Sequence, residues 1–189
     1  GYPVFPSLND CDVQADVVVD FASARAVDGL LDYCEAHGMP LVLCTTGLSE
    51  EQVRRVVSAS EKTAILRSAN MSLGINVLLE LVKKAASVLG DSYDIEIVER
   101  HHRRKVDAPS GTAIHTAHGI AEARKAAGLA PVPDATETDG GSRGQVVDGI
   151  HVHAVRLRGL NAHEEVLFGN AGEQLTIRAD SFDRTSFMP

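Results

Sequence analysis

One short segment of this sequence combines residues that transfer protons with residues that bind anions. His101, His102 and Lys105 lie in a basic stretch, and the run 110–112 (Ser-Gly-Thr) follows shortly after the lysine. An imidazole can donate a proton near neutral pH, and a lysine can pair with a carboxylate or act as an acid. The segment therefore predicts a site that binds an anion and supplies a proton to it.

The run 110–112 is predicted to open a helix, and a helix N-terminus is suited to anion binding. Its first backbone N–H groups have no partner within the helix, and the helix dipole is positive there. Gly111 lets a ligand approach the backbone closely, and the two neighbouring hydroxyls add further donors. Two plainer interpretations stay open: the basic stretch is a solvated surface, and Ser110 is an ordinary N-cap.

The elements that precede this segment alternate between strand and helix. Short apolar runs predict buried strands, longer amphipathic stretches predict helices, and Ser49 opens one helix with the spacing of a capping box. The predicted strands are 15–21, 39–44, 63–67 and 93–99, and the predicted helices are 24–37, one beginning at Ser49, and 72–89. This order predicts an open parallel sheet with helices on both faces, in which ligands bind beyond the carboxyl ends of the strands.

The second half of the chain follows a different pattern. A basic loop over 100–109 leads into a helix over 110–128, and an exposed loop covers 129–149. Three alternating runs at 150–156, 165–168 and 174–179 then predict antiparallel strands. The fold class predicted is α/β: a Rossmann-like parallel-sheet domain of nucleotide type over 1–70, and an α+β domain of substrate type with a mixed sheet over 71–189.

Composition excludes several classes of protein. Lys and Arg number 18 against 26 Asp and Glu, and the resulting charge of −8 argues against nucleic acid or an anionic membrane as the main partner. No apolar run approaches the ~20 residues that span a bilayer. The three cysteines, at positions 11, 34 and 44, form no disulfide framework, which suits a reducing compartment. We therefore expect a cytoplasmic location.

The segment 99–113 resembles the signature E-x-H-H-x-x-K-x-D-A-P-S-G-T-A of the dihydrodipicolinate (4-hydroxy-tetrahydrodipicolinate) reductase family. Further stretches along almost the whole chain are similar to that family's strands and turns. They are 16–21 (DVVVDF), 44–47 (CTTG), 68–74 (SANMSLG), 94–99 (DIEIVE), 172–177 (GEQLTI) and 183–187 (DRTSF).

The resemblance implies a reaction, a cofactor and a set of site residues. The family reduces 4-hydroxy-tetrahydrodipicolinate with NADPH or NADH in lysine and diaminopimelate synthesis, which implies a small dicarboxylate substrate and a homotetramer. The implied catalytic residues are His101 and Lys105, and the implied substrate-binding residues are His102, Ser110, Gly111 and Thr112. The implied cofactor-binding residues are Cys44, Thr45, Thr46, Gly47, Ser68, Ala69, Asn70 and Met71. No metal site is implied.

The sequence departs from the family pattern at several places. No G-x-x-G-x-(M/L)-G loop occurs, the glycine cluster at 140–144 is interpreted as a turn, and Cys44 stands where the family has glycine. The stretch 156–164 replaces a more glycine-rich loop. We expect the chain to continue beyond both ends, with the glycine loop before it and a last helix after it. Two alternatives stay open: a related two-domain NAD(P)-dependent amino-acid dehydrogenase, and a non-catalytic binding module.

The remaining histidines and cysteines are expected to be structural. His151 and His153 lie two apart on a strand and share a face, which favours cross-strand hydrogen bonds over a metal site. Cys44 is expected to be a small buried residue, and Cys11 and Cys34 to be structural. The other histidines, His37, His115, His118 and His163, are expected at the surface or as caps.

Overall fold

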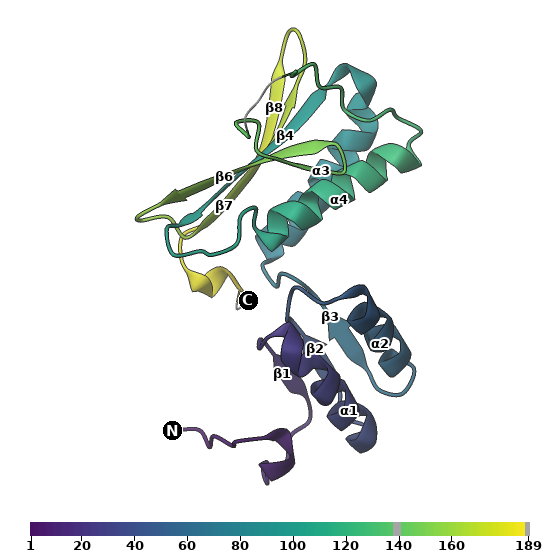
Figure 1. The fold of residues 1–189 in the computed structure, drawn as a ribbon, viewed down its shortest axis with the longest axis vertical. Coiled ribbons are helices and arrows are strands. Elements are labelled where there is room, and N and C mark those ends of the chain that lie inside the picture. Colours follow the sequence, from purple (N-terminus) through teal and green to yellow (C-terminus); the bar gives the residue numbers. More distant parts are fainter. Residues whose placement is uncertain (138–140, 188–189) are drawn as a thin grey trace. The chain divides into compact units, whose positions relative to one another are not determined.

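A computed structural model describes residues 1–137 and 141–187 of the chain. The chain divides into two compact units, Gly1–Ala69 and Asn70–Pro189, and each is described by itself. Figure 1 shows the helices and strands of each unit. Short 3-10 turns complete the element order, at Leu8–Asp10, Ala24–Ala26, Gly90–Ser92 and Arg184–Phe187.

The first unit is built on a small parallel sheet. β1 (Val18–Asp20), β2 (Leu41–Leu43) and β3 (Ile65–Arg67) pair in that order, and α1 (Val27–His37) and α2 (Glu50–Ser60) form the crossovers between them (Figure 1). All three predicted strands and both predicted helices of this region are confirmed, although the strands are shorter than expected.

The ends of the two helices follow from local sequence. At Ser49 the side chain accepts a hydrogen bond from Gln52 N while the Gln52 side chain accepts one from Ser49 N, so the predicted capping box is present. At the end of α1, Gly38 adopts a left-handed conformation with φ 60°, which glycine tolerates without steric cost.

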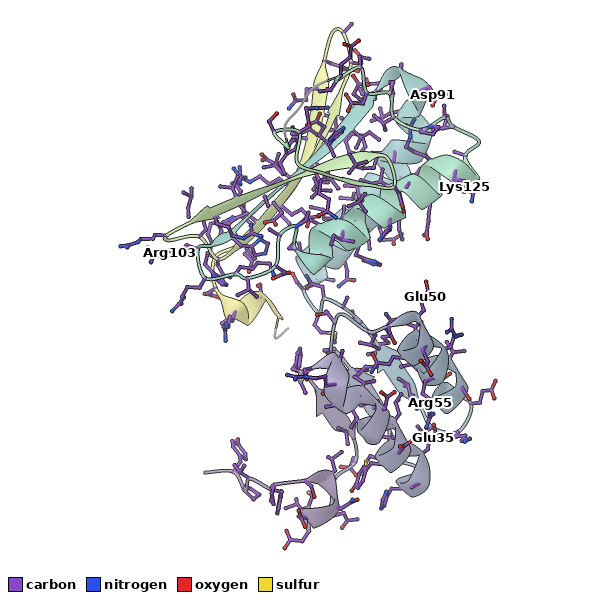
Figure 2. All side chains as sticks on the ribbon, in the orientation of Figure 1. Glu35, Glu50, Arg55, Asp91, Arg103 and Lys125 are labelled. Carbon is purple, nitrogen blue, oxygen red and sulfur yellow. The ribbon has the colours of Figure 1, made fainter. Side chains whose placement is uncertain are left out.

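Ion pairs join the two helices on their exposed side. Figure 2 shows Arg55 of α2 reaching toward Glu35 of α1, and Arg55 also lies 2.8 Å from Asp32. Lys62 Nζ lies 2.7 Å from the other oxygen of Glu35. Hydrogen bonds from Lys62 and Arg55 lower the pKa of Glu35, so that carboxylate stays charged between its two cations.

The prediction of helices on both faces of the parallel sheet is wrong for the described residues. Side chains of α1 and α2 join Leu41 and Leu43 in one buried cluster, so both helices cover the same face. The other face leaves Val19 and Leu66 each 56% exposed. The reason is topological: the strand order β1-β2-β3 runs in one direction, and right-handed crossovers change faces only where that direction reverses.

The second unit is a five-stranded mixed sheet covered on one face by two helices. Its strand order is β5-β6-β4-β7-β8, and Figure 1 shows α3 (Leu73–Leu89) and α4 (Gly111–Ala126) packed against it. A single core cluster joins both helices to the sheet. The strands are β4 (Asp94–His102), β5 (Gln145–Val147), β6 (Ile150–Leu157), β7 (Ala162–Gly169) and β8 (Gln174–Ser181).

Several predictions for this half were wrong in detail. β4 does not extend the first sheet; it is the central strand of the second, parallel to β6 and antiparallel to β7. β6 was expected to be antiparallel to its neighbours, but α4 is long enough to form the crossover that a parallel pair requires. The strand also continues through His102, which shortens the predicted loop, and β5 was not predicted.

Candidate active site

The strand β4 carries the site because its alternation places polar groups at the end of a buried face. Ile95 and Ile97 are buried in the core, and Glu99 and His101 continue the same face toward the carboxyl end of the strand. A carboxylate thus occupies a position where the pattern would place a third apolar residue. Glu99 has no solvent exposure.

Four hydrogen bonds satisfy the Glu99 carboxylate. Arg156 donates from its two terminal nitrogens, at 2.6 Å to Oε2 and 2.7 Å to Oε1. Ser110 N donates to Oε1 at 3.0 Å, and His101 Nδ1 lies 2.7 Å from Oε2. The register of the parallel pair explains part of this geometry, because Arg156 on β6 is the partner of His101 on β4.

This environment keeps Glu99 ionised. Burial by itself would raise the pKa of the carboxyl, but the hydrogen bonds and charges of His101 and Arg156 outweigh it and lower the pKa to about 2. Glu99 is therefore an anion that can only accept hydrogen bonds.

The loop after β4 brings Lys105 to the same region of the unit. Lys105 Nζ lies 2.8 Å from Asp107 Oδ1, and Lys105 N donates to His102 O at 3.0 Å. Burial raises the pKa of Asp107, but the hydrogen bond from Lys105 and those from the backbone, including Gly111, lower it overall. Arg156 also donates to the Asp107 carbonyl at 2.7 Å, which ties this loop to β6.

The predicted helix start at 110–112 is confirmed as the N-terminus of α4. Ser110 Oγ accepts from Ala113 N at 3.2 Å, so Ser110 is an N-cap as expected. Thr112 Oγ1 accepts a hydrogen bond from Asn70 Nδ2 at 3.2 Å, which brings a residue implied for the cofactor beside one implied for the substrate. His102 Nδ1 is a buried ring nitrogen without a hydrogen-bond partner among the described residues.

The residues implied for the cofactor divide between the two units. Those up to Ala69 lie in the first unit, around the carboxyl edge of the parallel sheet, and Asn70 and Met71 belong to the second. At the sheet edge, Thr45 Oγ1 donates to Asp20 Oδ2 at 2.5 Å and Cys44 N donates to Asp20 O at 2.9 Å. Ser68 N donates to Leu43 O at 3.1 Å, which places the segment after β3 beside β2.

The turn after β2 has its own conformational demand. Gly47 adopts a φ of 74°, so the left-handed residue of the turn is Gly47 and not Cys44. Cys44 is buried, as expected for a small structural residue, and burial raises the pKa of its thiol.

Sequence reasoning missed four residues that build this site. Glu99, Arg156 and Asp107 organise the loop and the helix start, and Glu164 on β7 lies opposite Glu99 in the ladder. Glu164 is buried and accepts a 2.6 Å hydrogen bond from Thr116 Oγ1. The available signal was the alternation itself, since both glutamates stand at core positions of their strands.

The other histidines mostly behave as expected. His153 Nε2 lies 2.7 Å from Glu96 Oε2 on the neighbouring strand, so the predicted cross-strand hydrogen bond is confirmed for His153. His151 instead contacts the loop before β5, at 2.8 Å from Asp134 Oδ2 and 2.8 Å from the Arg143 carbonyl. His163 is a correction: it is buried, and its Nδ1 lies 2.6 Å from Asp180 Oδ1. Register causes this, because His163 and Asp180 are direct partners of β7 and β8.

The described residues contain neither a candidate membrane span nor a candidate metal cluster. Among them, no helix is long and apolar enough to cross a membrane. Within the same part of the chain, no group of three or more His, Cys, Asp or Glu side chains is placed to hold a metal ion.

A cavity of about 470 Å³ lies near the C-terminal end of α4, away from the residues described above. Its lining includes Lys125, Leu129 and Val132. Figure 2 labels Lys125 at this end of the helix, and it labels Arg103, just past the end of β4, in a different part of the unit. The cavity therefore does not belong to the candidate site at the start of α4.

Comparison with known proteins finds the same family along both units. The family model described as "Dihydrodipicolinate reductase, N-terminus" matches residues 1–71, and "Dihydrodipicolinate reductase, C-terminus" matches residues 74–189. A "4-hydroxy-tetrahydrodipicolinate reductase" of Bifidobacterium longum (strain NCC 2705) is 60% identical over 181 residues, which cover 92% of this chain and 70% of that protein.

Relatives of lower sequence identity carry the same enzyme names. The protein of the same name from Corynebacterium efficiens is 48% identical over 182 residues, covering 94% of this chain and 72% of the relative. A solved structure, "Dipicolinate bound Dihydrodipicolinate reductase from Paenisporosarcina sp. TG-14", is 38% identical with a TM-score of 0.71. The match covers 92% of this chain and 64% of that one, so this chain spans slightly less than two thirds of the solved relative.

Proposed function

The chain belongs to the dihydrodipicolinate reductase family, and from this premise we propose that it provides the active site of a 4-hydroxy-tetrahydrodipicolinate reductase. The reaction is the NADPH- or NADH-dependent reduction of 4-hydroxy-tetrahydrodipicolinate to tetrahydrodipicolinate in lysine and diaminopimelate biosynthesis. Loss of water gives the unsaturated dicarboxylate, dihydrodipicolinate, which then gains one hydride and one proton. The observation that carries the proposal is that two buried or ion-paired carboxylates bring an imidazole and a lysine beside the start of α4: Glu99 contacts both His101 and Ser110 N, and Asp107 contacts both Lys105 and the Gly111 backbone.

The second unit is proposed to bind the substrate. The two carboxylates of the substrate would be held by His102 and by the start of α4, from Ser110 to Thr112. At this helix start the dipole and the hydroxyl groups favour an anion. Lys105 adds a positive charge and can supply a proton, and His101 is the proposed acid/base. His102 has a buried nitrogen to offer, since its Nδ1 has no partner among the described residues.

The first unit is proposed to bind the nicotinamide cofactor through the turn after β2 and the segment after β3. These residues fit such a group: they lie at the carboxyl edge of a parallel sheet, where α/β proteins bind nucleotides. At Gly47 an added Cβ would meet no atom within 4 Å, which leaves space beside the turn. When bound, the cofactor supplies a hydride. The chain's contribution is orientation and charge.

The assignment of residues 1–70 to the cofactor and 71–189 to substrate and oligomerisation follows the same proposal. We also propose that the protein is a homotetramer and that it is located in the cytoplasm. The mixed sheet leaves its second face uncovered by helices in the described part of the chain, which suits association between copies.

The test is the loss of NADPH or NADH absorbance with freshly prepared 4-hydroxy-tetrahydrodipicolinate, using the full-length protein that contains this chain. Rapid oxidation by the parent and by Lys125→Ala, with a large loss in Lys105→Ala, is the expected result. Lys125 is a matched control because it lies in the same unit, in the lining of the cavity at the other end of α4. An intact parent that oxidises neither cofactor would overturn the proposal and favour a related dehydrogenase or a binding module.

A further inference from the structure

We propose that Glu99 is a positioning residue for catalysis, which holds His101 with its proton on Nδ1 and so reserves Nε2 for proton exchange with the substrate. This inference rests on the proposed function, because His101 acts as acid/base only in that reaction. It assigns a function to a carboxylate that touches neither substrate nor cofactor in the proposed site.

The first step of the argument is the contact itself. Glu99 Oε2 lies 2.7 Å from His101 Nδ1, and both residues belong to the same face of β4. The Glu99 side chain has no solvent exposure, while that of His101 retains 13%. Nδ1 of His101 is thus hydrogen-bonded to the buried Glu99 carboxylate, and the His101 ring lies where the buried face of β4 meets solvent.

The second step is the charge on Glu99. Arg156 places two N–H groups on the two carboxylate oxygens, a bidentate arrangement that favours the ionised form. The low pKa of Glu99, about 2, agrees with this geometry. An ionised carboxylate has no proton to donate, so the proton in the contact with His101 must be on Nδ1.

The third step is what the tautomer does. In a neutral imidazole one nitrogen carries the proton and the other is an acceptor, so a proton fixed on Nδ1 makes Nε2 the basic atom. A carboxylate that orients a histidine in this way acts through geometry and tautomer, without itself exchanging the proton. Glu99 therefore selects which ring atom of His101 can accept or return a proton.

The fourth step is the connection to the rest of the site. The same carboxylate accepts Ser110 N at 3.0 Å, so one buried anion joins β4, β6 and the start of α4. Such an anion costs free energy to desolvate, and an apolar residue here would serve packing alone. The arrangement is explained if the charge fixes His101 and the helix start relative to each other.

The chain contains a matched control on the opposite face of the same strand. Glu96 also contacts an arginine and a histidine, since Arg143 donates at 2.6 Å and His153 Nε2 lies 2.7 Å away. Its side chain is 30% exposed. Glu96→Gln therefore removes the same kind of carboxylate from the same strand without altering the His101 contact.

The experiment compares the full-length parent with Glu99→Gln and Glu96→Gln. Nitrogen-15 chemical shifts of labelled histidine report the tautomer of the neutral ring, with His101 assigned by His101→Ala. The parent and Glu96→Gln are expected to show the Nδ1–H form, and Glu99→Gln to lose this preference. In the oxidation assay kcat should fall roughly 10- to 100-fold in Glu99→Gln with a smaller change in KM, as for other groups that orient an imidazole.

A double-mutant cycle separates positioning from general damage. In the His101→Ala background, Glu99→Gln should cause no further loss of kcat, because its effect passes through His101. A full additional loss would overturn the inference, as would an Nε2–H ring in the parent, a measurement that does not depend on whether Glu99→Gln folds. If the parent shows the Nδ1–H form but oxidises no cofactor, the proposed function fails while the tautomer assignment stands.

Discussion

Glu99 and Glu164 lie directly opposite each other in the antiparallel ladder between β4 and β7, and both are buried. The pKa values of the two carboxyls nevertheless move in opposite directions, to about 2 for Glu99 and about 7 for Glu164. Glu99 has Arg156 and His101 as partners, whereas burial, partly offset by a hydrogen bond from Thr116 and reinforced by the charge of Glu99, raises the pKa of Glu164. Glu99 is an anion because His101 and Arg156 stabilise its charge, and that charge in turn helps to raise the pKa of Glu164.

The surroundings of Glu164 fit a protonated acid. Thr116 Oγ1 lies 2.6 Å from Glu164 Oε1 and 3.1 Å from the Thr112 carbonyl oxygen. A hydroxyl carries one proton and a carbonyl can only accept. Thr116 therefore shares its one proton between the Thr112 carbonyl and Glu164, and this shared hydrogen bond lowers the pKa of Glu164 by less than burial raises it.

The first prediction concerns stability against pH. Because the folded pKa of Glu164 is raised from 4.5 to about 7, its protonated form stabilises the fold fully below pH 4.5, and this contribution is lost as pH rises through 7. The shift corresponds to a loss of roughly 3 kcal/mol across that window, at about 1.4 kcal/mol for each pKa unit. Urea unfolding of the chain at pH 5 and pH 8, set beside Glu164→Gln, measures it.

Glu164→Gln keeps the shape of a neutral acid and removes the titration. Its free energy of unfolding should therefore fall less between the two pH values than that of the parent. Equal pH dependence in the two proteins would show that Glu164 does not ionise in this range.

The second prediction concerns Arg156. Arg156→Met leaves the buried Glu99 carboxylate without its bidentate cation, and breaking a buried pair from one side costs about 3–5 kcal/mol. The control is Arg178→Met, since Arg178 is 45% exposed and its ion pairs with Glu165 and Asp180 are worth about 1 kcal/mol or less. Denaturant unfolding of both variants measures the loss of unfolding free energy. Similar losses in the two variants would mean that the buried Glu99 carboxylate does not require Arg156 for its stability.

Much of the fold could be predicted from the sequence because local signals are strong where elements are regular. The capping box at Ser49 and the N-cap at Ser110 both depend on a few neighbouring residues, and both are present. The sheet to which β4 belongs could not be read in the same way, since pairing with β6 and β7 is decided by residues fifty or more positions away. The order of elements alone favoured the wrong sheet.

The same division applies to the site. The residues in the contiguous signature, such as His101 and Lys105, are adjacent in sequence and could be proposed from it. Arg156 and Glu164 come close to Glu99 only through strand register, so their neighbours in sequence did not assign them to the site. For Glu99 and Glu164, a charged residue at a core position of a strand was a further sequence signal, because such a residue requires a partner.

The third prediction concerns Gly144, where the chain passes close to β6. Gly144 has a φ of 72°, and an added Cβ would clash with the Val152 carbonyl oxygen. Gly159→Ala is the matched control, because Gly159 has a similar φ of 80° but nothing within 4 Å of an added Cβ. Gly159→Ala should cost about 1 kcal/mol from the left-handed conformation alone, and Gly144→Ala clearly more. Thermal unfolding measures both, and equal losses would refute the close approach.

The last prediction concerns Asp107, whose carboxylate lies 2.8 Å from Lys105 Nζ and accepts a hydrogen bond from the Gly111 backbone. Lys105 is proposed to supply positive charge to the substrate, and the start of α4 is proposed to bind one of its carboxylates, so Asp107 competes with that substrate for both groups. Asp107→Asn keeps the size of the side chain and removes its charge, and it should lower the Kd for a dianionic ligand a few-fold, because about 1 kcal/mol of competing ion pair is lost. Calorimetric titration with dipicolinate measures the Kd.

Asp180→Asn, on β8 beside His163 and Arg178, is the control for removing an ion-paired aspartate from the same unit. An unchanged or higher Kd in Asp107→Asn would show that Asp107 supports the loop and does not compete for the ligand.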